Sequence, residues 1–264
     1  MSITAAGAVN VCVANLYKSA GYQSEVVSQA VLNEPLECLE ESQGFVRVKT
    51  KDEYSGWIDA EQLVKGTFHN KDLKMVRAHL LKLRQAPAPG SKPVNYAVIG
   101  CRLSCIDTKD GWYQVALPDN RTGWAKKEGF GSFPRFSEQA VISLAREFLG
   151  YPYFWGGKTP NGLDCSGFVQ LVFGLLGKPL PRDSWMQEIQ GSRRINRIED
   201  AGPGDLLFFG KTKPVVTHVA ISLGSSRIIH CQGMVKENSL KESDRYYHAE
   251  LKQNFICGKQ IHRN

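Results

Sequence analysis

Two patterns of hydrophobic and polar positions divide the chain. Residues 11–127 consist of short segments rich in β-branched and aromatic positions, typical of strands, with little helical periodicity. Over residues 140–148 the apolar positions recur at helical spacing instead, with Ser137 placed to cap the helix and Gly150 to end it. We therefore expect a β-rich part followed by a part that contains helices.

A second helix is predicted to open at Asp164-Cys165-Ser166-Gly167, after a turn-rich aromatic loop over residues 151–157. Hydrophobic runs bounded by Gly, Pro and Ser then predict strands over residues 205–209, 215–223, 227–231 and 254–261. Two helices followed by several antiparallel strands are the order of an α+β domain.

The β-rich part contains an internal repeat. Gly44-Phe45-Val46-Arg47-Val48 is followed by Gly56-Trp57-Ile58, and Gly111-Trp112-Tyr113-Gln114-Val115 by Gly123-Trp124-Ala125. The copies are 67 residues apart at the first glycine (111 − 44) and at the second (123 − 56), which indicates two copies of one small unit. Each copy combines two strands, a polar turn and an aromatic core, and resembles a bacterial SH3 module.

These patterns predict three domains. Two SH3-like domains, small β-barrels, are expected over residues 1–66 and 67–130, and an α+β domain over 131–264. The glycines and proline of residues 129–136 mark the last boundary.

Composition and charge narrow the class of protein. The 264 residues are 42% hydrophobic and 22% charged, as in globular domains. The apolar runs fall short of the roughly 18–20 residues of a membrane-spanning helix. The formal charge of +7 is scattered, so we expect a basic surface, no nucleic-acid partner and no insertion into a membrane. We expect a monomer.

The N-terminal residues 1–8 do not show a basic region followed by an apolar core, the pattern of a secretory signal. We therefore expect a cytoplasmic protein. A secreted or wall-associated protein is the alternative if a leader was removed.

Cys165 stands out among the seven cysteines, which include no CxxC pair of the kind found in zinc sites. It begins a predicted helix, where free N–H groups and the helix dipole stabilise a thiolate and an oxyanion. The alternative is a cysteine that merely packs in the core. The other six are expected to be structural free thiols.

Two histidines favour a reactive Cys165 over a packed one, because a cysteine nucleophile needs a base and that base needs an orienting partner. If Leu223 pairs with Arg227 across the predicted turn, His218 and His230 become diagonal neighbours on one face. The alternative is two unrelated core histidines.

The motifs around these residues resemble the NlpC/P60 family. They are Tyr153-Phe154-Trp155-Gly156-Gly157, Leu163-Asp164-Cys165-Ser166-Gly167-Phe168, Pro203-Gly204-Asp205-Leu206, Thr217-His218-Val219-Ala220-Ile221 and Arg227-Ile228-Ile229-His230. The resemblance implies a papain-like α+β fold, with Cys165 as nucleophile, His218 as base and His230 orienting His218. It implies no metal or cofactor.

The resemblance also suggests residues that contact the substrate. Tyr153 is expected near the thiolate and the oxyanion, together with Trp155 and Ser166, and Asp164 is expected to position the site.

Pro181-Arg182-Asp183-Ser184-Trp185-Met186-Gln187 resembles an element of family members that cut the bond from γ-D-glutamate to a diamino acid in peptides with a free N-terminal L-alanine. Asp183 can pair with that ammonium, and Ser184 can hydrogen-bond beside it. The alternative is that Asp183 and Ser184 cap a helix. By the same resemblance Glu25 and Tyr54 help to hold the amine, although a solvated Glu25 and a packed Tyr54 fit the sequence as well.

The sequence thus predicts a cysteine endopeptidase that hydrolyses the γ-D-glutamyl–diamino acid bond, to L-lysine or meso-diaminopimelate, in peptidoglycan stem peptides or murein fragments. Its alternative is a hydrolase of the intact cell wall that uses the SH3-like domains as wall-binding modules. A non-catalytic wall-binding protein and an acyltransferase fit the cysteine, the two histidines and Asp183 less well.

Overall fold

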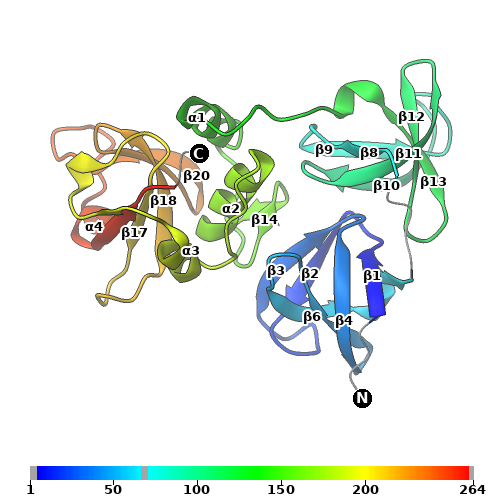
Figure 1. Cartoon of the computed structure of the whole chain (residues 1–264), viewed down its shortest axis with the longest axis horizontal. Coiled ribbons are helices and arrows are strands. Elements are labelled where there is room, and N and C mark those ends of the chain that lie inside the picture. The colour runs from blue at the N-terminus through cyan, green and yellow to red at the C-terminus, as the bar shows by residue number, and fades with distance from the viewer. Residues whose placement is uncertain (1–4, 67–70, 262–264) are drawn as a thin grey trace. The chain divides into compact units, whose positions relative to one another are not determined.

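The computed structural model describes residues 5–66 and 71–261, and the chain divides into two compact units, Met1–Phe133 and Pro134–Asn264. The first unit consists of strands joined by short turns, and the second combines helices with a sheet (Figure 1). Within the described ranges, no helix is both long enough and apolar enough to cross a bilayer.

The first sheet of the N-terminal unit has the strand order β3-β2-β6-β5-β4-β1-β7. Its strands are β1 (Ala5–Val9), β2 (Val13–Tyr17), β3 (Val26–Val31), β4 (Pro35–Ser42), β5 (Phe45–Lys49), β6 (Ser55–Asp59) and β7 (Leu63–Lys65), with the 3-10 helix η1 (Ala60–Gln62) before β7. Alternating side chains of these strands, among them Leu16, Val48 and Ile58, form one buried core.

The second sheet has the order β10-β9-β13-β12-β11-β8. Its strands are β8 (Leu73–Met75), β9 (Leu80–Arg84), β10 (Pro93–Val98), β11 (Arg102–Lys109), β12 (Trp112–Ala116) and β13 (Thr122–Lys126), followed by the 3-10 helix η2 (Lys127–Gly129). Adding seven to each strand number of the first sheet, β7 excepted, gives this same order.

The register of the two sheets repeats as well. Arg47 lies opposite Trp57 in the pair β5–β6, and Gln114 lies opposite Trp124 in the pair β12–β13. Both residues of the second pair follow their counterparts by 67 positions (114 − 47 and 124 − 57). The internal repeat predicted from the spacing of glycines and aromatic residues is therefore confirmed in strand order and register.

The C-terminal unit has a six-stranded antiparallel sheet in the order β16-β21-β17-β18-β19-β20. Its strands are β16 (Arg194–Ile195), β17 (Leu206–Phe209), β18 (His218–Gly224), β19 (Arg227–Gln232), β20 (Met234–Ser239) and β21 (Phe255–Lys259). A small hairpin, β14 (Lys158–Thr159) with β15 (Gly162–Leu163), precedes it. The helices are α1 (Glu138–Arg146), α2 (Cys165–Leu175), α3 (Ser184–Gln190) and α4 (Ala249–Gln253), with the 3-10 helix η3 (Ile198–Asp200).

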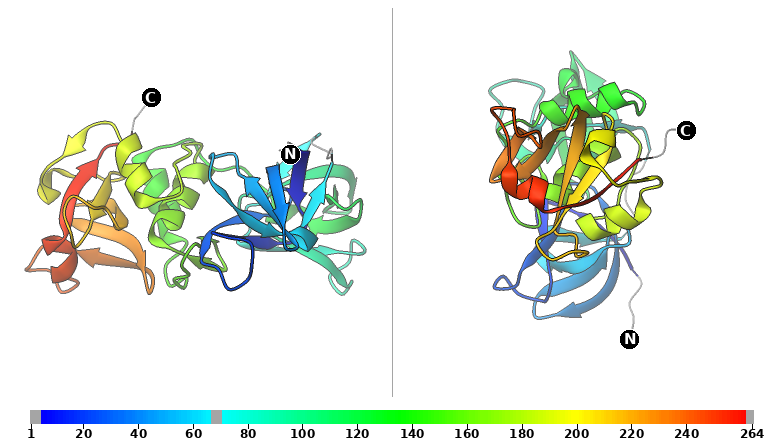
Figure 2. Two further views of the ribbon diagram at one scale, coloured as in Figure 1. Left: turned by 90° about the horizontal axis from the view of Figure 1, so that it is seen from below. Right: turned by 90° about the vertical axis from the view of Figure 1, so that its left-hand side faces the viewer.

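Helix α2 lies against β18 and β19, and α1 packs beside α2 (Figure 2). The apolar residues Phe168, Val169 and Val172 of α2 are fully buried, because the helix packs between the sheet and its neighbouring elements. A further cluster, which includes Leu207, Ala220, Ile228, Leu240 and Leu251, fills the space that α4 and η3 help to enclose. The helix that carries Cys165 is thus fixed along its length.

The expected elements of this unit are present, although some bounds differ and several short elements, including β14, β15, β16 and η3, were not predicted. Helix α1 ends at Arg146, one turn earlier than predicted, and the chain turns until Gly150 at a φ of +83°. Strand β18 begins at His218 and not at residue 215. Strand β20 and helix α4 were not predicted, because their polar residues mask the alternation of the strand and the periodicity of the short helix.

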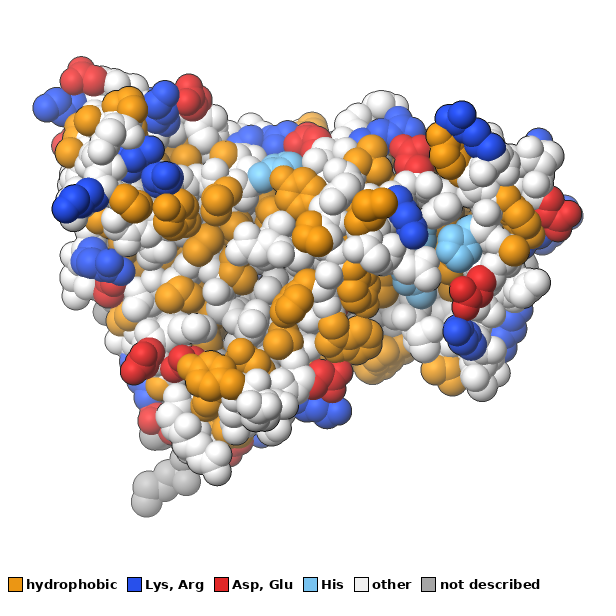
Figure 3. Space-filling model, turned by 180° about the vertical axis from the view of Figure 1, so that it is seen from behind, with side chains coloured by type: hydrophobic (Ala, Val, Ile, Leu, Met, Phe, Trp, Pro, Cys, Tyr) orange, Lys and Arg blue, Asp and Glu red, His pale blue; other side chains and the backbone are white. Residues whose placement is uncertain are grey.

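Charged side chains are interspersed over the surface. On the face drawn in Figure 3, Lys and Arg alternate with Asp and Glu and with hydrophobic side chains. Many of the lysines and arginines form ion pairs, such as Lys49 with Glu37 and Arg121 with Asp119. This matches the scattered charge expected from the sequence.

Replacing Gly167 tests how closely the start of α2 packs against the loop before it. A Cβ atom at Gly167 would lie 2.0 Å from the carbonyl oxygen of Gly157, whereas one at Gly174, on the same helix, would meet nothing within 4 Å. We expect Gly167→Ala to lower the free energy of unfolding by about 2–3 kcal/mol through this clash. Gly174→Ala should raise it by up to about 1 kcal/mol through helix propensity. Urea denaturation of the two variants measures both; equal effects would contradict this packing.

Candidate active site

The carboxylate of Asp164 organises the first turn of α2. Its Oδ1 accepts a hydrogen bond from the N–H of Gly167 at 2.6 Å, which makes Asp164 the N-cap of the helix. Its Oδ2 accepts from the N–H of Gly156 at 3.0 Å, in the aromatic loop before the helix. The Ser166 hydroxyl also lies 3.2 Å from Oδ1. Asp164 therefore holds the loop and the helix start together.

Arg182 completes this arrangement. Its guanidinium donates to both carboxylate oxygens of Asp164, at 3.1 Å and 2.5 Å, and to Ser166 Oγ at 3.0 Å. Arg182 is 1% exposed and Asp164 is 7% exposed, so the pair is a buried, two-pronged ion pair. The hydroxyl of Ser166 and the carboxylate of Asp164 are engaged inside the protein. These contacts agree with the positioning role expected for Asp164, and the predicted substrate contact of Ser166 stays a prediction.

Cys165 is the first residue of α2, and its sulfur lies against β18. The paired register of β18 and β19 ends at Ile221 opposite Ile229. Beyond that point, the backbone N–H of Val219 donates to the sulfur of Cys165. The sulfur therefore lies against the residue next to His218, at 9% exposure of the cysteine.

Burial decides the ionisation of this thiol. Loss of hydration raises the pKa of Cys165 to about 12, and the Asp164 carboxylate acts in the same direction. The N–H groups of Val219 and Ser166 and the guanidinium of Arg182 act to lower the pKa but do not offset burial. Burial therefore acts against the expected resting thiolate. The helix N-terminus lies where it was predicted, but the thiol is protonated at neutral pH.

The two histidines are brought together. Nε2 of His218 lies 2.9 Å from Nδ1 of His230, and the rings are nearly perpendicular with centroids 5.1 Å apart. The predicted register holds at Ile221 opposite Ile229, but a bulge at the turn places Gly224 opposite Arg227. The diagonal contact predicted from the alternation of strand residues is confirmed.

Both imidazoles are neutral at neutral pH. Burial lowers the pKa of His218 to about 3, and His230, His248 and Lys236 act in the same direction. Burial likewise lowers the pKa of His230 to about 4, against the hydrogen bond to the Asn238 oxygen, which raises it. The free protein thus holds a neutral thiol beside two neutral imidazoles.

Asn238 of β20 is a site residue that the sequence analysis missed. Its Oδ1 lies 2.9 Å from Nε2 of His230, and its Nδ2 donates to the carbonyl of Tyr246 at 3.1 Å. Lys236, two residues before Asn238 on the same strand, lies opposite His230. The polar run Lys236-Glu237-Asn238 hides the alternation of β20, so no clear signal in the sequence indicated that Asn238 lies near His230.

Tyr153 lies beside the thiol, and Trp155 points to solvent. Burial, followed by the nearby Cys165 and Asp164, raises the pKa of Tyr153 well above its usual value. The backbone N–H of Tyr153 donates to the carbonyl of Gly233, which fixes the loop to β20. Trp155 is 60% exposed, so it lies on the surface next to this site.

Asp183 and Ser184 stand at the start of α3, one and two residues after Arg182. Asp183 occupies the N-cap position, but its side chain accepts no hydrogen bond from the N–H groups of the first turn. Ser184 is 8% exposed. The alternative that the carboxylate of Asp183 serves as the cap of this helix is thus wrong, and a role in binding remains a prediction.

Glu25 and Tyr54 belong to the N-terminal unit. Glu25 forms an ion pair with Lys18 at 3.3 Å, and its side chain is 42% exposed. Tyr54 is half-buried, and its carbonyl accepts hydrogen bonds from both the N–H and the hydroxyl of Thr50. Their predicted contact with a substrate amine stays a prediction.

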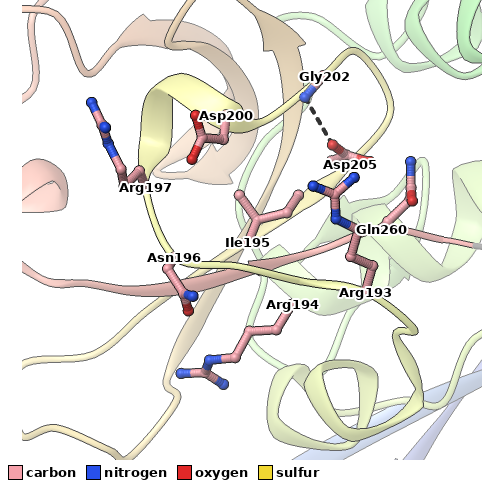
Figure 4. A pocket seen from close by; sticks show the side chains of 9 residues that line it. All are labelled: Arg193, Arg194, Ile195, Asn196, Arg197, Asp200, Gly202, Asp205 and Gln260. Atoms are coloured by element: carbon pink, nitrogen blue, oxygen red, sulfur yellow. Dashed lines mark hydrogen bonds between the residues drawn. The ribbon is translucent and has the colours of Figure 1, made fainter.

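A separate pocket opens near the other edge of the sheet, around β16 and η3 (Figure 4). The N–H of Gly202 donates to Asp205 Oδ2 at 2.8 Å there, and Arg193 lies close enough to act on the pKa of Asp205. None of the predicted site residues lines this pocket, so it is distinct from the thiol and imidazoles.

Comparison with known proteins agrees with this geometry. Residues 150–254 match the NlpC/P60 family, and residues 16–63 match the SH3 domain of bacterial dipeptidyl-peptidases. The chain is 26% identical over 260 residues to dipeptidyl-peptidase 6 of Lysinibacillus sphaericus, covering 90% of this chain and 93% of that one. It is 27% identical over 228 residues to γ-D-glutamyl-L-lysine dipeptidyl-peptidase of Bacillus cereus, covering 78% and 67%.

A solved structure shows the same fold. The crystal structure of an NlpC/P60 family protein from Bacillus cereus superposes with a TM-score of 0.82 at 21% identity, covering 97% of this chain and 99% of that one. The fold and the matched domain define a cysteine peptidase. The chain carries an NlpC/P60 domain over residues 150–254 and a bacterial SH3 domain ahead of it.

The ionisation of Cys165 can be read from its alkylation by iodoacetamide, since only the thiolate reacts. With a pKa near 12, the rate at Cys165 should rise about tenfold per pH unit from pH 7 to pH 9 with no plateau. Mass spectrometry of the peptide that contains Cys165 measures the rate, and Cys165→Ala identifies its signal. A rate that is already constant below pH 7 would show a resting thiolate and contradict the neutral thiol.

The contribution of the buried Arg182–Asp164 ion pair can be tested by replacing two arginines with methionine, one buried and one half exposed. Arg182→Met leaves the Asp164 carboxylate buried without its partner, so we expect a loss of about 3–5 kcal/mol in the free energy of unfolding. Arg194→Met removes an ion pair with Glu188 whose arginine is half exposed, and should cost at most about 1 kcal/mol. Urea denaturation compares them; similar losses would mean that the Arg182–Asp164 pair does not hold the site.

Proposed function

We propose that this protein is a cysteine endopeptidase that hydrolyses the bond between γ-D-glutamate and a diamino acid in peptidoglycan stem peptides, acting on peptides with a free N-terminal L-alanine. The single observation that carries the proposal is the convergence of the Cys165 thiol, at the start of α2, with the His218–His230 pair. The names of the two curated relatives, both dipeptidyl-peptidases, support the substrate class.

In the proposed mechanism, Cys165 is the nucleophile. As its sulfur attacks the γ-carbonyl carbon, the thiol proton moves to His218, because a protonated thiol of raised pKa is a weak nucleophile until it loses that proton. The negative charge on the carbonyl oxygen is stabilised by N–H groups at the start of α2 and by the Tyr153 hydroxyl.

The intermediate then collapses. The C–N bond breaks, His218 gives its proton to the amine of the diamino acid, and the L-Ala-γ-D-Glu part remains bound to Cys165 as a thioester. A water molecule, whose proton His218 accepts, hydrolyses the thioester and restores the thiol. His230 orients His218 through both steps, by the contact of 2.9 Å between their rings.

Selectivity for a free amine is assigned to Asp183 and Ser184, helped by Glu25 and Tyr54. The Asp183 carboxylate carries the negative charge that an ammonium group requires, at the start of α3 and next to Arg182. A substrate whose amine is acylated would leave that carboxylate desolvated without a positive charge, which discriminates strongly between the two substrates.

We also propose that residues 71–130 form a second SH3-like module, because the second sheet repeats the strand order of the first. The peptidase unit is proposed to have a papain-like fold.

We propose that the protein works in the cytoplasm. All seven cysteines, including five that are buried, are free thiols. Free thiols are typical of a reducing compartment.

The substrate is tested by incubating the protein with L-Ala-γ-D-Glu-L-Lys and with its N-acetylated form, and analysing the products by mass spectrometry. We expect L-Ala-γ-D-Glu and lysine from the free peptide, with kcat/KM about a hundredfold or more above that of the acetylated form. Cys165→Ala should abolish turnover. Equal cleavage of both peptides would instead favour a hydrolase of intact cell wall, and cleavage of neither would reject the proposed bond.

Substitutions test whether the proposed amine-binding residues recognise the free amine of the substrate. Asp183→Asn keeps the size but removes the charge, so it should lower kcat/KM for the free peptide and leave the slow cleavage of the acetylated peptide unchanged. Asp200→Asn, at an exposed position of η3, is the matched control and should change neither. Glu25→Gln and Tyr54→Phe should act in the same direction as Asp183→Asn. Unaltered selectivity in Asp183→Asn would remove this residue from recognition.

A further inference from the structure

The hydrogen bonds beyond His230 determine which ring nitrogens carry protons. The carbonyl oxygen of Tyr246 can only accept, so the Asn238 atom 3.1 Å from it is the NH₂ group. That carbonyl also accepts from the backbone N–H of Ser239 at 2.9 Å, which fixes its place in the loop after β20. The amide of Asn238 is therefore held with its oxygen toward His230.

An oxygen at that position accepts and cannot donate. Nε2 of His230, 2.9 Å away, must be the nitrogen that bears the hydrogen. In a neutral imidazole the other nitrogen then has a free lone pair, so Nδ1 of His230 is an acceptor. Since Nε2 of His218 lies 2.9 Å from it, Nε2 of His218 is the donor, and Nδ1 of His218 has the lone pair.

We propose that Asn238 is a positioning residue that sets the tautomers of both histidines and so leaves Nδ1 of His218 free to accept the proton of Cys165. This inference rests on the proposed roles of Cys165 and His218 and extends them. A triad that ends on a carboxylate would favour a charged imidazole. Here the hydrogen bonds that run from His218 through His230 end on the neutral amide of Asn238, which a main-chain carbonyl holds in place. The amide directs these hydrogen bonds without adding charge.

The surroundings of the rings support this reading. The titratable and charged groups that act on them are the two imidazoles themselves, Lys236 from β20 and His248 from the N-terminus of α4. Lys236 and His248 disfavour an imidazolium, and the ring of His248 is already an acceptor, from the N–H of Leu251 at 3.3 Å. In neutral rings it is the tautomer, and not the charge, that distinguishes an active base from an inactive one.

The tautomers can be measured without substrate. In full-length protein labelled with ¹⁵N-histidine, long-range ¹H–¹⁵N correlation at pH 7 should show His218 and His230 protonated at Nε2, with His218→Ala and His230→Ala to assign the signals. Asn238→Leu removes the acceptor, so His230 should shift toward the Nδ1–H form and His218 should follow. His218 protonated at Nδ1 in the wild type would overturn the proposal, whatever peptide the protein cleaves.

Kinetics give the second readout. Asn238→Leu should lower kcat about 10- to 100-fold while KM changes less than about twofold, because substrate contacts are intact. Asn238→Asp keeps an acceptor oxygen, so it should recover most of the activity. Its carboxylate should also move the acid limb of the pH–rate profile to higher pH, since a negative charge favours the imidazolium. Equal loss in both variants with unchanged tautomers would reduce Asn238 to a packing role and overturn the proposal.

Glu237→Gln is the matched control. Glu237 precedes Asn238 on β20, points to the opposite face, and pairs with Arg146 and Arg227. Its replacement disturbs the same strand without touching the imidazoles, so tautomers and kcat should stay as in the wild type. A loss of kcat in Glu237→Gln equal to that in Asn238→Leu would show that β20 acts only through stability. Failure to cleave the tripeptide at all, with the tautomers as expected, would count against the proposed substrate and not against the role of Asn238.

Discussion

The ion pair between Asp164 and Arg182 is the interaction on which the site depends. One carboxylate caps α2, holds the loop that carries Tyr153 and receives two hydrogen bonds from a guanidinium that is 1% exposed. Charges buried to this degree are stable only in well-formed geometry, so the pair admits one arrangement of the segments it joins. Cys165 follows Asp164, and Asp183 follows Arg182. The nucleophile and the residues proposed to bind the amine are therefore placed by the same contact.

The same burial sets the chemistry of the thiol. A cysteine at a helix N-terminus is commonly associated with a thiolate, and the N–H groups that would stabilise it are present at Ser166 and Val219. Burial outweighs them and keeps both Cys165 and His218 neutral in the free protein. The reacting anion is then formed only during attack, when the charge passes to the carbonyl oxygen. A buried neutral pair is also poorly reactive toward solutes other than a bound substrate.

Local patterns predicted most of the elements that carry the site. The helix start at residues 164–167 and the contact of His218 with His230 followed from local patterns, because helix starts and strand alternation depend on nearby residues. The predictions failed where the deciding partner is distant in sequence. The thiolate was expected from the helix end alone, but the pKa depends on how tightly β18 and α2 enclose the sulfur. Asn238 was missed because its role appears only when β20 is placed beside β19, and β20 has three polar residues in succession at 236–238.

The hydrogen bonds from His218 through His230 and Asn238 end on a main-chain atom, the carbonyl of Tyr246 in the loop between β20 and α4. A backbone oxygen is present whatever side chain the residue bears. The side chain of residue 246 can therefore vary while the imidazoles keep their orientation, provided that the loop holds this carbonyl in place. An insertion or deletion in this loop, far from the cysteine in sequence, would move that carbonyl and so reach the imidazoles through Asn238.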